Sequence, residues 1–436
     1  MSHTAFNIKS ETDTISPTFC PVPWEHQYFE TDGSESLCCR SFGPARGDME
    51  WNGSEMREIR LNMLAGRKSK PCNVCYNEEK NIDGMSMRQQ YISNSRIRAG
   101  RDMKYYRKFV NDVTDKDGRV SNQSSTLQIS LGNTCTGQCV PCSPWNSSAL
   151  RSLHKQINNN LGWDGLDVRD FNWIKDNAMW EKKIYPIIER SDFIAVSGGE
   201  PFITKRTEQI LEHCIEKNIA KDKILYYNTN CAQSIPNKII ELWKNFKYIT
   251  VNLSVDDVGE RNDYVRYPVK WSQFLKFLNW SDNNKDDNIS FELMPSIGNY
   301  NLYYYPDFID WVIKQRFQKV GRNFGGMPII NIIHFPERCG IKTLPEKAND
   351  IIIEKYNKWF SKFTTDCDSN IKEVRDNFEW SLNATMQLPN LLQDNEYLGE
   401  LHGQDHYTVF KQWHTELDKI RGTSFYDTFP IFKEFE

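Results

Sequence analysis

The stretch CTGQCVPC, residues 135–142, places three cysteines in a C-x3-C-x2-C pattern just after a short apolar segment at 127–131. Three neighbouring thiolates can bind one metal centre, and soft sulfur ligands select zinc, copper(I) or an iron–sulfur cluster. A structural zinc or an ordinary four-iron cluster takes four protein ligands, whereas Cys135, Cys139 and Cys142 supply three. The pattern therefore predicts a metal centre with one open position, where a substrate or cofactor can coordinate.

A second motif, SGGEP at 197–201, follows the next apolar run, at 193–196. Gly198 and Gly199 allow a backbone conformation and a close approach that a Cβ would block, and Glu200 can accept from an ammonium group. The cysteine run alone is also compatible with a zinc site. The two motifs together resemble the radical S-adenosylmethionine (SAM) enzymes.

The resemblance implies a [4Fe-4S] cluster held by Cys135, Cys139 and Cys142, whose open iron chelates the amino and carboxylate groups of SAM. It also implies that the stretch from Gly198 to Pro201 helps to bind the SAM amino group. In this family the cluster delivers an electron that cleaves SAM to methionine and a 5′-deoxyadenosyl radical, which abstracts hydrogen from a substrate. The electron comes from an external donor of the flavodoxin or ferredoxin type.

Beyond residue 120, short β-rich runs alternate with helical patterns, which indicates βα units around a parallel sheet. The predicted strands are 127–131, 192–196, 223–227, 248–254, 289–294 and 329–334. Apolar residues at helical spacing predict helices at 148–160, 170–189, 205–217, 236–245, 271–280 and 306–317. Six strands match the partial (β/α)6 barrel that the resemblance implies, in which chemistry collects at the carboxyl ends of the strands.

Three later loops carry polar residues at such strand ends. Asn230 belongs to a pair that resembles the third-strand TN element of peptide-modifying family members. Ser254 and Asp256 resemble an S-x-D element whose polar groups contact the ribose and methionyl parts of SAM. Arg266 is suited to pair with the SAM carboxylate. The alternatives are that Asp256 caps a helix and that Arg266 forms a surface ion pair.

Another cysteine group precedes the core motif. Cys20, Cys38, Cys72 and Cys75 form a C-x12-G-x4-C pattern followed by a C-x2-C knuckle. The pattern resembles the twitch module, a half-length relative of the SPASM domain, which implies an auxiliary [4Fe-4S] cluster. In most relatives this module follows the core, whereas here it precedes it. A structural zinc is the alternative, because zinc accepts the same four ligands.

Two details of this module can be predicted from its spacing. Gly33 fits a hairpin turn between residues 27–30 and the strand that enters Cys38, and this hairpin would bring Cys38 back beside Cys20. Cys39 is a spare cysteine. The spacing favours Cys38 as the ligand, with Cys39 either substituting for it or remaining free.

Composition and charge restrict the class of protein. Hydrophobic content of 39% and charged content of 26% are typical of a soluble globular chain, and a net charge of −4 gives no global nucleic-acid signature. The chain has no apolar stretch near the roughly 18 residues that span a bilayer and no signal-peptide pattern. We therefore expect a cytoplasmic protein without a membrane partner, where clustered cysteines favour metal binding over disulfides.

The remaining cysteines and the basic segment have simpler interpretations. The isolated cysteines are predicted to be buried small hydrophobes; they are Cys214, Cys231, Cys339 and Cys367. Residues 87–110 interleave arginine and lysine with tyrosine. This pattern favours a solvated helix face, with RNA binding as the alternative.

The predicted organisation has four parts. Residues 1–16 form a disordered tail, 17–120 the twitch-like module and a basic helical linker, 121–340 the radical SAM core, and 341–436 a helical extension. The extension is predicted to contain helices at about 346–363, 368–382 and 404–420, which cover the barrel or form a lid.

The resemblance favours a peptide or protein substrate that is crosslinked, epimerised or oxidised. A small metabolite such as a sugar or an amine is an alternative, and RNA is a weaker one. The rival outside enzymology is a zinc-dependent binding protein that uses both cysteine groups as structural knuckles.

Overall fold

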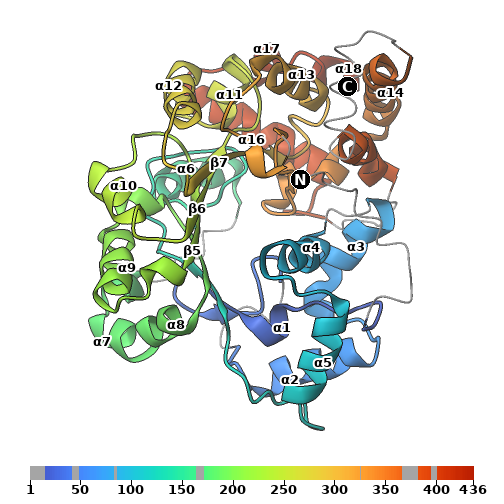
Figure 1. Ribbon diagram of the computed structural model, residues 1–436. Helices are drawn as coiled ribbons and strands as arrows, with labels where there is room; N and C mark the ends of the chain where they lie inside the picture. Colours follow the sequence, from blue (N-terminus) through green and yellow to red (C-terminus); the bar gives the residue numbers. More distant parts are fainter. Residues whose placement is uncertain are drawn as a thin grey trace. The chain divides into compact units, whose positions relative to one another are not determined.

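The computed structural model describes residues 15–41, 49–82, 86–163, 171–324, 326–365, 382–393 and 400–436. It has a mixed α/β architecture with parallel strands and many helices (Figure 1). The chain divides into two compact units. The first contains residues 1–132, 170–197 and 209–225, and the second contains 133–169, 198–208 and 226–436. The four-part functional division expected from the sequence stays a prediction.

The first unit contains a sheet segment with the strand order β2-β1-β3-β4. Strand β1 (His26–Phe29) pairs antiparallel with β2 (Glu35–Ser36) and parallel with β3 (Thr126–Ser130), and β3 pairs parallel with β4 (Phe193–Ser197). The predicted hairpin is confirmed, because the chain turns between β1 and β2 through Gly33, whose φ is +85°. A side chain is strained at this φ, which explains the glycine.

The first unit also contains helices that precede β3 in the chain. They are α1 (Val22–Glu25), α2 (Ser54–Leu64), α3 (Asn73–Asn81), α4 (Met87–Ala99) and α5 (Met103–Val113). Phe19, Trp24 and Tyr106 are buried in a common core with α2 and α5. The basic segment is helical as expected, and α5 begins at the N-cap Asp102, whose carboxylate accepts from the amide of Tyr105.

The helix predicted at 170–189 is broken into pieces. A 3-10 turn (Asn172–Lys175) precedes α7 (Asn177–Met179), a π-helical turn (Trp180–Ile184) and α8 (Tyr185–Arg190). Pro186 lies at the start of α8. Because proline has no N–H and crowds the preceding turn, a regular α-helix cannot run through it, and the turn before it widens.

In the second unit, β6 (Tyr248–Ser254) and β7 (Ile289–Met294) form a parallel pair. The residues of both strands are buried on either face almost throughout, as in parallel sheets covered by helices. Strand β5 (Ile224–Thr229) is shared, since residues 224–225 belong to the first unit and the rest to the second. Together with β3 and β4, these three strands confirm the five strands predicted up to residue 294, with small shifts of their ends.

The sixth predicted strand, 329–334, is mostly wrong. Only β9 (Asn331–Ile332) forms there, and it pairs with β8 (Ser296–Ile297) in a separate two-stranded sheet. Pro295 separates β7 from β8 and has no N–H to donate, so it interrupts a continuous ladder at this point. Closure of a partial (β/α)6 barrel therefore stays a prediction.

The helices that follow these strands in the second unit agree with the predicted helices. They are α6 (Leu150–Leu161), α9 (Lys205–Glu216), α10 (Asn237–Trp243), α12 (Trp271–Asp282) and α13 (Tyr305–Gln315). The later residues of α9 belong to the first unit. Helix α11 (Glu260–Val265) was not predicted. In the part of the chain that the structure describes, no helix is both long and apolar enough to cross a membrane.

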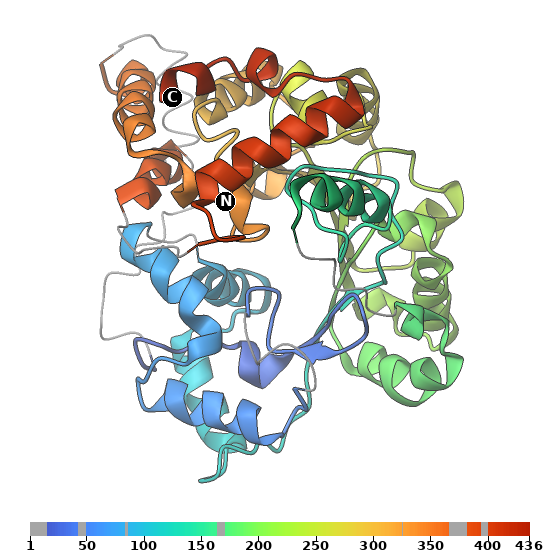
Figure 2. The same ribbon diagram turned by 180° about the vertical axis from the view of Figure 1, so that it is seen from behind.

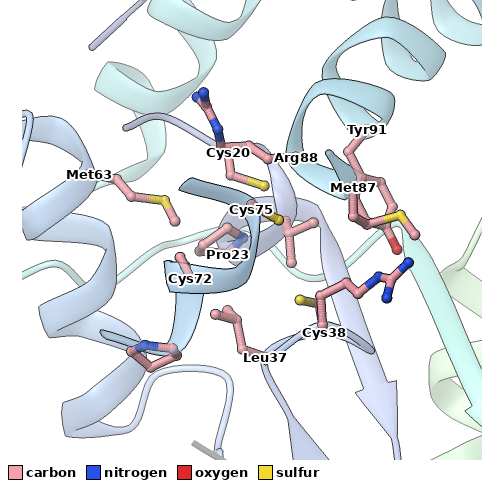
Figure 3. Close-up of a pocket in the computed structure, with 13 residues that line it drawn as sticks. Cys20, Pro23, Leu37, Cys38, Met63, Cys72, Cys75, Met87, Arg88 and Tyr91 are labelled. Carbon is pink, nitrogen blue, oxygen red and sulfur yellow. The ribbon is translucent and has the colours of Figure 1, made fainter. Parts of the chain in front are cut away.

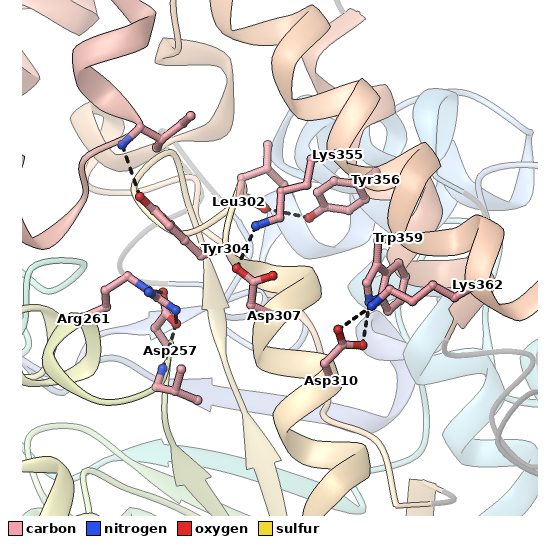
Figure 4. Close-up of polar contacts among 12 residues, drawn as sticks. Asp257, Arg261, Leu302, Tyr304, Asp307, Asp310, Lys355, Tyr356, Trp359 and Lys362 are labelled. Atoms are coloured by element: carbon pink, nitrogen blue, oxygen red, sulfur yellow. Dashed lines mark hydrogen bonds and ion pairs between the residues drawn. The ribbon is translucent and has the colours of Figure 1, made fainter. Parts of the chain in front are cut away.

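The carboxyl-terminal extension is helical as expected. It contains α14 (Glu346–Thr365), α16 (His406–Arg421), α17 (Phe425–Thr428) and α18 (Phe432–Phe435). The helix predicted at 368–382 lies almost wholly outside the described residues. Helix α14 packs on α13, where Lys355 binds Asp307 at 2.7 Å and the Trp359 indole donates to Asp310 at 2.8 Å (Figure 4). Helix α16 lies beside α6 (Figure 2).

Candidate functional site

The cysteine loop, residues 135–142, follows β3 and belongs to the second unit. Its backbone is held by the end of α11 (Glu260–Val265) and the residues just after it. The amide of Gln138 donates to the carbonyl of Tyr267 at 2.7 Å, and the amide of Val140 donates to the carbonyl of Val265 at 2.8 Å. These two bonds flank Cys139, which is buried. The loop therefore presents its cysteines from an anchored backbone.

Gly137 allows two of the sulfurs to converge. A Cβ built on Gly137 would lie 3.4 Å from Cys139 Sγ, 3.5 Å from Cys135 Sγ and 3.5 Å from the side-chain nitrogen of Asn230. An added Cβ would therefore be in ordinary van der Waals contact with both sulfurs. Burial and, to a smaller extent, the nearby thiols of Cys139 and Cys135 raise the pKa of the Cys142 thiol to about 12. The sulfurs of Cys135 and Cys139 thus both lie against Gly137, and the Cys142 thiol lies near enough to interact with them electrostatically.

The GGEP motif lies against the start of the cysteine loop. The amide of Glu200 donates to the carbonyl of Thr134 at 2.8 Å. Gly199 has a φ of +53°, and a Cβ there would lie 2.2 Å from the same carbonyl oxygen. Two motifs found separately in the sequence are therefore in direct backbone contact, and the second glycine of the motif is required for that contact.

Glu200 connects this motif to the loop after β5. Its buried carboxylate accepts from the amide of Asn230 at 2.8 Å and from the Thr229 hydroxyl at 3.0 Å. Burial raises the pKa of Glu200 to about 7, and these hydrogen bonds oppose the shift. The Asn230 side chain in turn donates to Cys135 Sγ at 3.5 Å. Glu200 was predicted to accept from an ammonium group, and here its oxygens also join two loops.

Asp256 and Arg266 pair with each other. Arg266 Nε lies 2.6 Å from Asp256 Oδ2, and a second guanidinium nitrogen donates to Oδ1 at 2.6 Å. Both residues are buried, so the pair is not the surface ion pair considered from the sequence. Asp256 also accepts from the amide of Ser296 at 2.7 Å. Ser254 is the last residue of β6.

The next carboxylate of this loop forms a separate cluster. Asp257 accepts from Arg261 through both oxygens, at 2.7 and 2.9 Å, and Arg261 stacks on Tyr304 with its guanidinium carbon 4.3 Å from the ring centre (Figure 4). Burial raises the pKa of Asp257 to about 6, opposed by Arg261. This cluster ties the β6 loop to the start of α13.

The amino-terminal cysteines line a cavity in the first unit (Figure 3). Cys20, Cys38, Cys72 and Cys75 face this cavity, whereas Cys39 is not among its lining residues. Burial raises the pKa of all four lining thiols, to about 12 for Cys72 and about 11 for Cys75. Cys38 therefore lines the cavity and Cys39 does not, and the choice of Cys38 as a metal ligand stays a prediction.

Arg88 also lines this cavity, although the sequence predicted that it lies on a solvated helix face. Arg88, on α4, lines it and lies near the thiols of Cys20 and Cys72, whose pKa values it lowers against the effect of burial. Arg88 is fixed by Glu79 and donates to the carbonyl of Phe19 at 2.8 Å. At this residue the prediction of a solvated basic helix face is wrong, because the side chain lines the cavity and its guanidinium is paired with Glu79.

Among the described residues, no group of three or more histidine, cysteine, aspartate or glutamate side chains has the arrangement of a metal-ion site. The isolated cysteines Cys214, Cys231 and Cys339 are buried, as predicted. Cys367 lies outside the described residues.

Two arginines beside the cysteine loop were not found from the sequence. Arg338, in the turn Glu337–Cys339, donates to the carbonyl of Val140 at 3.4 Å, and Arg421, the last residue of α16, donates to the carbonyl of Gln138. Neither belongs to a motif. Because their partners are backbone carbonyls distant in sequence, no local pattern predicts the contacts.

Comparisons with known proteins give weak structural likenesses. No protein family model matches the chain, and no curated protein matches it. SuiB of Streptococcus suis bound to S-adenosylmethionine aligns with 14% identity and a TM-score of 0.35, over 73% of this chain and 64% of that chain. The alignment thus spans less than two thirds of the length of SuiB.

Two further alignments involve structures that contain peptides. SuiB bound to the precursor peptide SuiA aligns with 14% identity and a TM-score of 0.35, over 71% of this chain and 69% of that one. Native anSMEcpe with bound AdoMet and the Cp18Cys peptide aligns with 12% identity and a TM-score of 0.35, over 68% and 97%. Similarity at this level does not establish a shared family, so any assignment of function depends on the residues of this chain.

Proposed function

We propose that this chain is a radical SAM enzyme that binds a [4Fe-4S] cluster through Cys135, Cys139 and Cys142. The observation that carries the proposal is the backbone hydrogen bond from Glu200 to Thr134, at 2.8 Å. A zinc knuckle does not require a GGEP motif to lie against its cysteine loop. A site that holds a cluster with the amino acid part of SAM beside it requires the two motifs to lie together.

The donor chemistry of these residues supports the proposal. Three soft thiolates leave one iron of a four-iron cluster without a protein ligand, and Gly137 keeps the space between Cys135 Sγ and Cys139 Sγ free of a side chain. When bound, the cluster and SAM supply a one-electron cleavage that gives methionine and a 5′-deoxyadenosyl radical.

The chain's own residues bind and orient these groups. Asn230 donates to Cys135 Sγ, and a hydrogen bond to sulfur stabilises the thiolate. Gly198 and Pro201 flank the two residues that contact the cysteine loop, and this backbone, with the carboxylate of Glu200, provides the acceptors for the SAM amino group. Ser254 is proposed to meet the ribose.

Arg266 and Asp256 act in this proposal as a pair. Because Asp256 already occupies the guanidinium fork, a SAM carboxylate would share Arg266 with Asp256 rather than bind a free cation. Arg266 also lies close enough to Cys139 to lower the pKa of its thiol, although burial has the larger, opposite effect. The pair therefore supplies a fixed dipole next to the cysteine loop.

For the amino-terminal cavity we propose an auxiliary [4Fe-4S] cluster ligated by Cys20, Cys38, Cys72 and Cys75. Four soft sulfurs that face one cavity support this assignment, and a structural zinc is the alternative with the same ligands. The proposed substrate is a residue of a peptide or protein. This step rests on the resemblance of the module and of the loops after β5 and β6 to peptide-modifying family members, as does the external flavodoxin or ferredoxin type of electron donor.

The proposal is tested with full-length protein reconstituted without oxygen, using iron and sulfide, then reduced with dithionite in the presence of SAM. We expect 5′-deoxyadenosine by mass spectrometry, and none from a variant in which Cys135, Cys139 and Cys142 are alanine. A variant with alanine at Cys214, a buried cysteine in the first unit, is the matched control. A colourless protein that contains zinc, without iron or sulfide, would instead identify a zinc-binding protein.

A further inference from the structure

Arg338 is a buried cation at the cysteine loop. It is 7% exposed, and its guanidinium carbon stacks 3.9 Å from the ring centre of Trp413. Its hydrogen bond goes to the carbonyl of Val140, which also accepts from Cys339 Sγ at 3.7 Å. The residue immediately after Cys139 is therefore held by this arginine.

Arg421 holds the residue on the other side of Cys139. It donates to the carbonyl of Gln138 and, at 3.3 Å, to the carbonyl of Tyr264. Its guanidinium stacks on Tyr267, with 4.4 Å between the guanidinium carbon and the ring centre. Stacking and backbone bonds fix the position of this cation.

Neither arginine forms a salt bridge within the part of the chain that the structure describes. The acidic residue near Arg421 is Asp418, whose carboxylate accepts instead from the Tyr264 hydroxyl at 2.9 Å and from the amide of Phe425 at 2.6 Å. Two histidines also lie near both arginines, His154 and His414. Burial and the two arginines lower their pKa values, to about 3 for His154, so neither adds charge at neutral pH.

Arg338 is buried and has no salt-bridge partner among the described residues, and a buried charge of this kind is costly. Arg421 is only partly buried. Arg338 interacts electrostatically with Cys339 and with Cys142 of the cysteine loop. Arg421 interacts with Tyr264, with Cys139 of the cysteine loop, and with Tyr267 and Asp418. As thiols, Cys142 and Cys139 carry no charge. As ligands of a cluster they are thiolates, so the two arginines would then lie beside negatively charged groups.

We propose, resting on the proposed function, that Arg338 and Arg421 are positioning residues that hold the cysteine loop by the carbonyls flanking Cys139 and raise the reduction potential of its cluster. Reduction adds one negative charge to an already anionic cluster, and fixed positive charge nearby favours that state. The net charge around a cluster and its hydrogen bonds are general determinants of its potential. The carboxyl-terminal segment would thereby set how readily the external donor reduces the cluster.

The test measures the midpoint potential of the cluster whose electron paramagnetic resonance signal changes when SAM is added, in full-length reconstituted protein. Arg338→Met and Arg421→Met remove the charge, whereas Arg338→Lys and Arg421→Lys keep it. Lys314→Met is the control for loss of one exposed charge, on α13. Iron content and circular dichroism are recorded for each variant.

We expect each methionine variant to have at least a tenfold smaller ratio of reduced to oxidised cluster at a fixed potential, equivalent to about 59 mV for one electron. The lysine variants and Lys314→Met should stay close to the native value. Methionine variants with the native potential overturn the inference.

If a methionine variant does not fold, the lysine variant at the same position decides. A native potential and iron content then support the role of charge, and a tenfold loss of the reduced form despite the retained charge overturns it. If the native chain takes up no cluster, the proposed function fails and this inference fails with it. If the cluster forms but its potential is the same in both methionine variants as in the native chain, this inference is overturned and the proposed function is not.

Discussion

The side-chain amide of Asn230 donates to Cys135 Sγ across 3.5 Å, while its carbonyl oxygen accepts from the amide of Ala232 at 2.8 Å. One residue thus shapes its own loop and faces a proposed cluster ligand. The two roles can be separated, because Asn230→Asp keeps the acceptor for Ala232 and removes the donor to the sulfur.

We expect Asn230→Asp to weaken cluster retention, since a carboxylate would replace a donor beside a thiolate. The loss of one hydrogen bond corresponds to about 1 kcal/mol, or roughly a fivefold to tenfold faster loss of iron to a chelator. The rate is followed by absorbance under anaerobic conditions. Asn245→Asp, at an exposed asparagine after α10, is the control, and equal rates for the two variants would refute the role of Asn230.

Gly199→Ala should destabilise the chain more than an ordinary glycine substitution. A side chain at a positive φ costs roughly 1–2 kcal/mol, and the overlap with the carbonyl of Thr134 adds a similar cost from overpacking. Gly162→Ala is the matched control, because Gly162 has a φ of +68° with no atom within 4 Å of the added Cβ. Thermal denaturation of the apo protein should show a clearly larger loss for Gly199→Ala, and equal losses would contradict the packing argument.

Cys38→Ala and Cys39→Ala should differ although the two positions are adjacent. Cys38 lines the cavity with the other three cysteines, whereas Cys39 contacts Gln128. If both sites hold four-iron clusters, the iron content of reconstituted Cys38→Ala should fall to about half. Cys39→Ala should retain the native content. A loss of iron in Cys39→Ala, with none in Cys38→Ala, would assign the ligand to the other cysteine.

The stability of the apo protein should depend on pH through Glu200. Its pKa is about 7 in the folded chain, above the usual 4.5, because burial penalises the charged form. The folded state therefore binds the proton more tightly than the unfolded state. This stabilisation is complete below pH 4.5 and is lost as the pH rises to about 7, with a total on the order of 3 kcal/mol.

Urea denaturation of native protein and of Glu200→Gln at pH 5 and pH 7.5 checks this dependence. The native chain should exceed the variant in stability by more at pH 5 than at pH 7.5, since glutamine does not titrate. Glu241→Gln, at an exposed carboxylate of α10 that pairs with Lys244, controls for a general charge effect. A difference that is the same at both pH values would show that Glu200 does not carry the dependence.

Much of the local structure could be predicted from the sequence. The five longer strands and the turn at Gly33 follow from apolar runs and glycine placement, which depend on neighbours in the chain. The segment 329–334 was predicted wrongly for the same reason. Its apolar run suits a strand, but the required partner contains Pro295, and a missing donor on a distant residue is invisible to a local pattern.

The sequence by itself determined the two cysteine groups, the GGEP motif and their places at strand ends, because these depend on spacing within short segments. Only the tertiary structure decided which side chains meet. In the structure Asp256 pairs with Arg266, and Cys38 rather than Cys39 lines the amino-terminal cavity. Arg88 lines that cavity instead of lying on a solvated helix face. Arg338 and Arg421 contact the cysteine loop. Each of these outcomes depends on the direction of a side chain and on contacts between distant segments, and residue spacing contains neither.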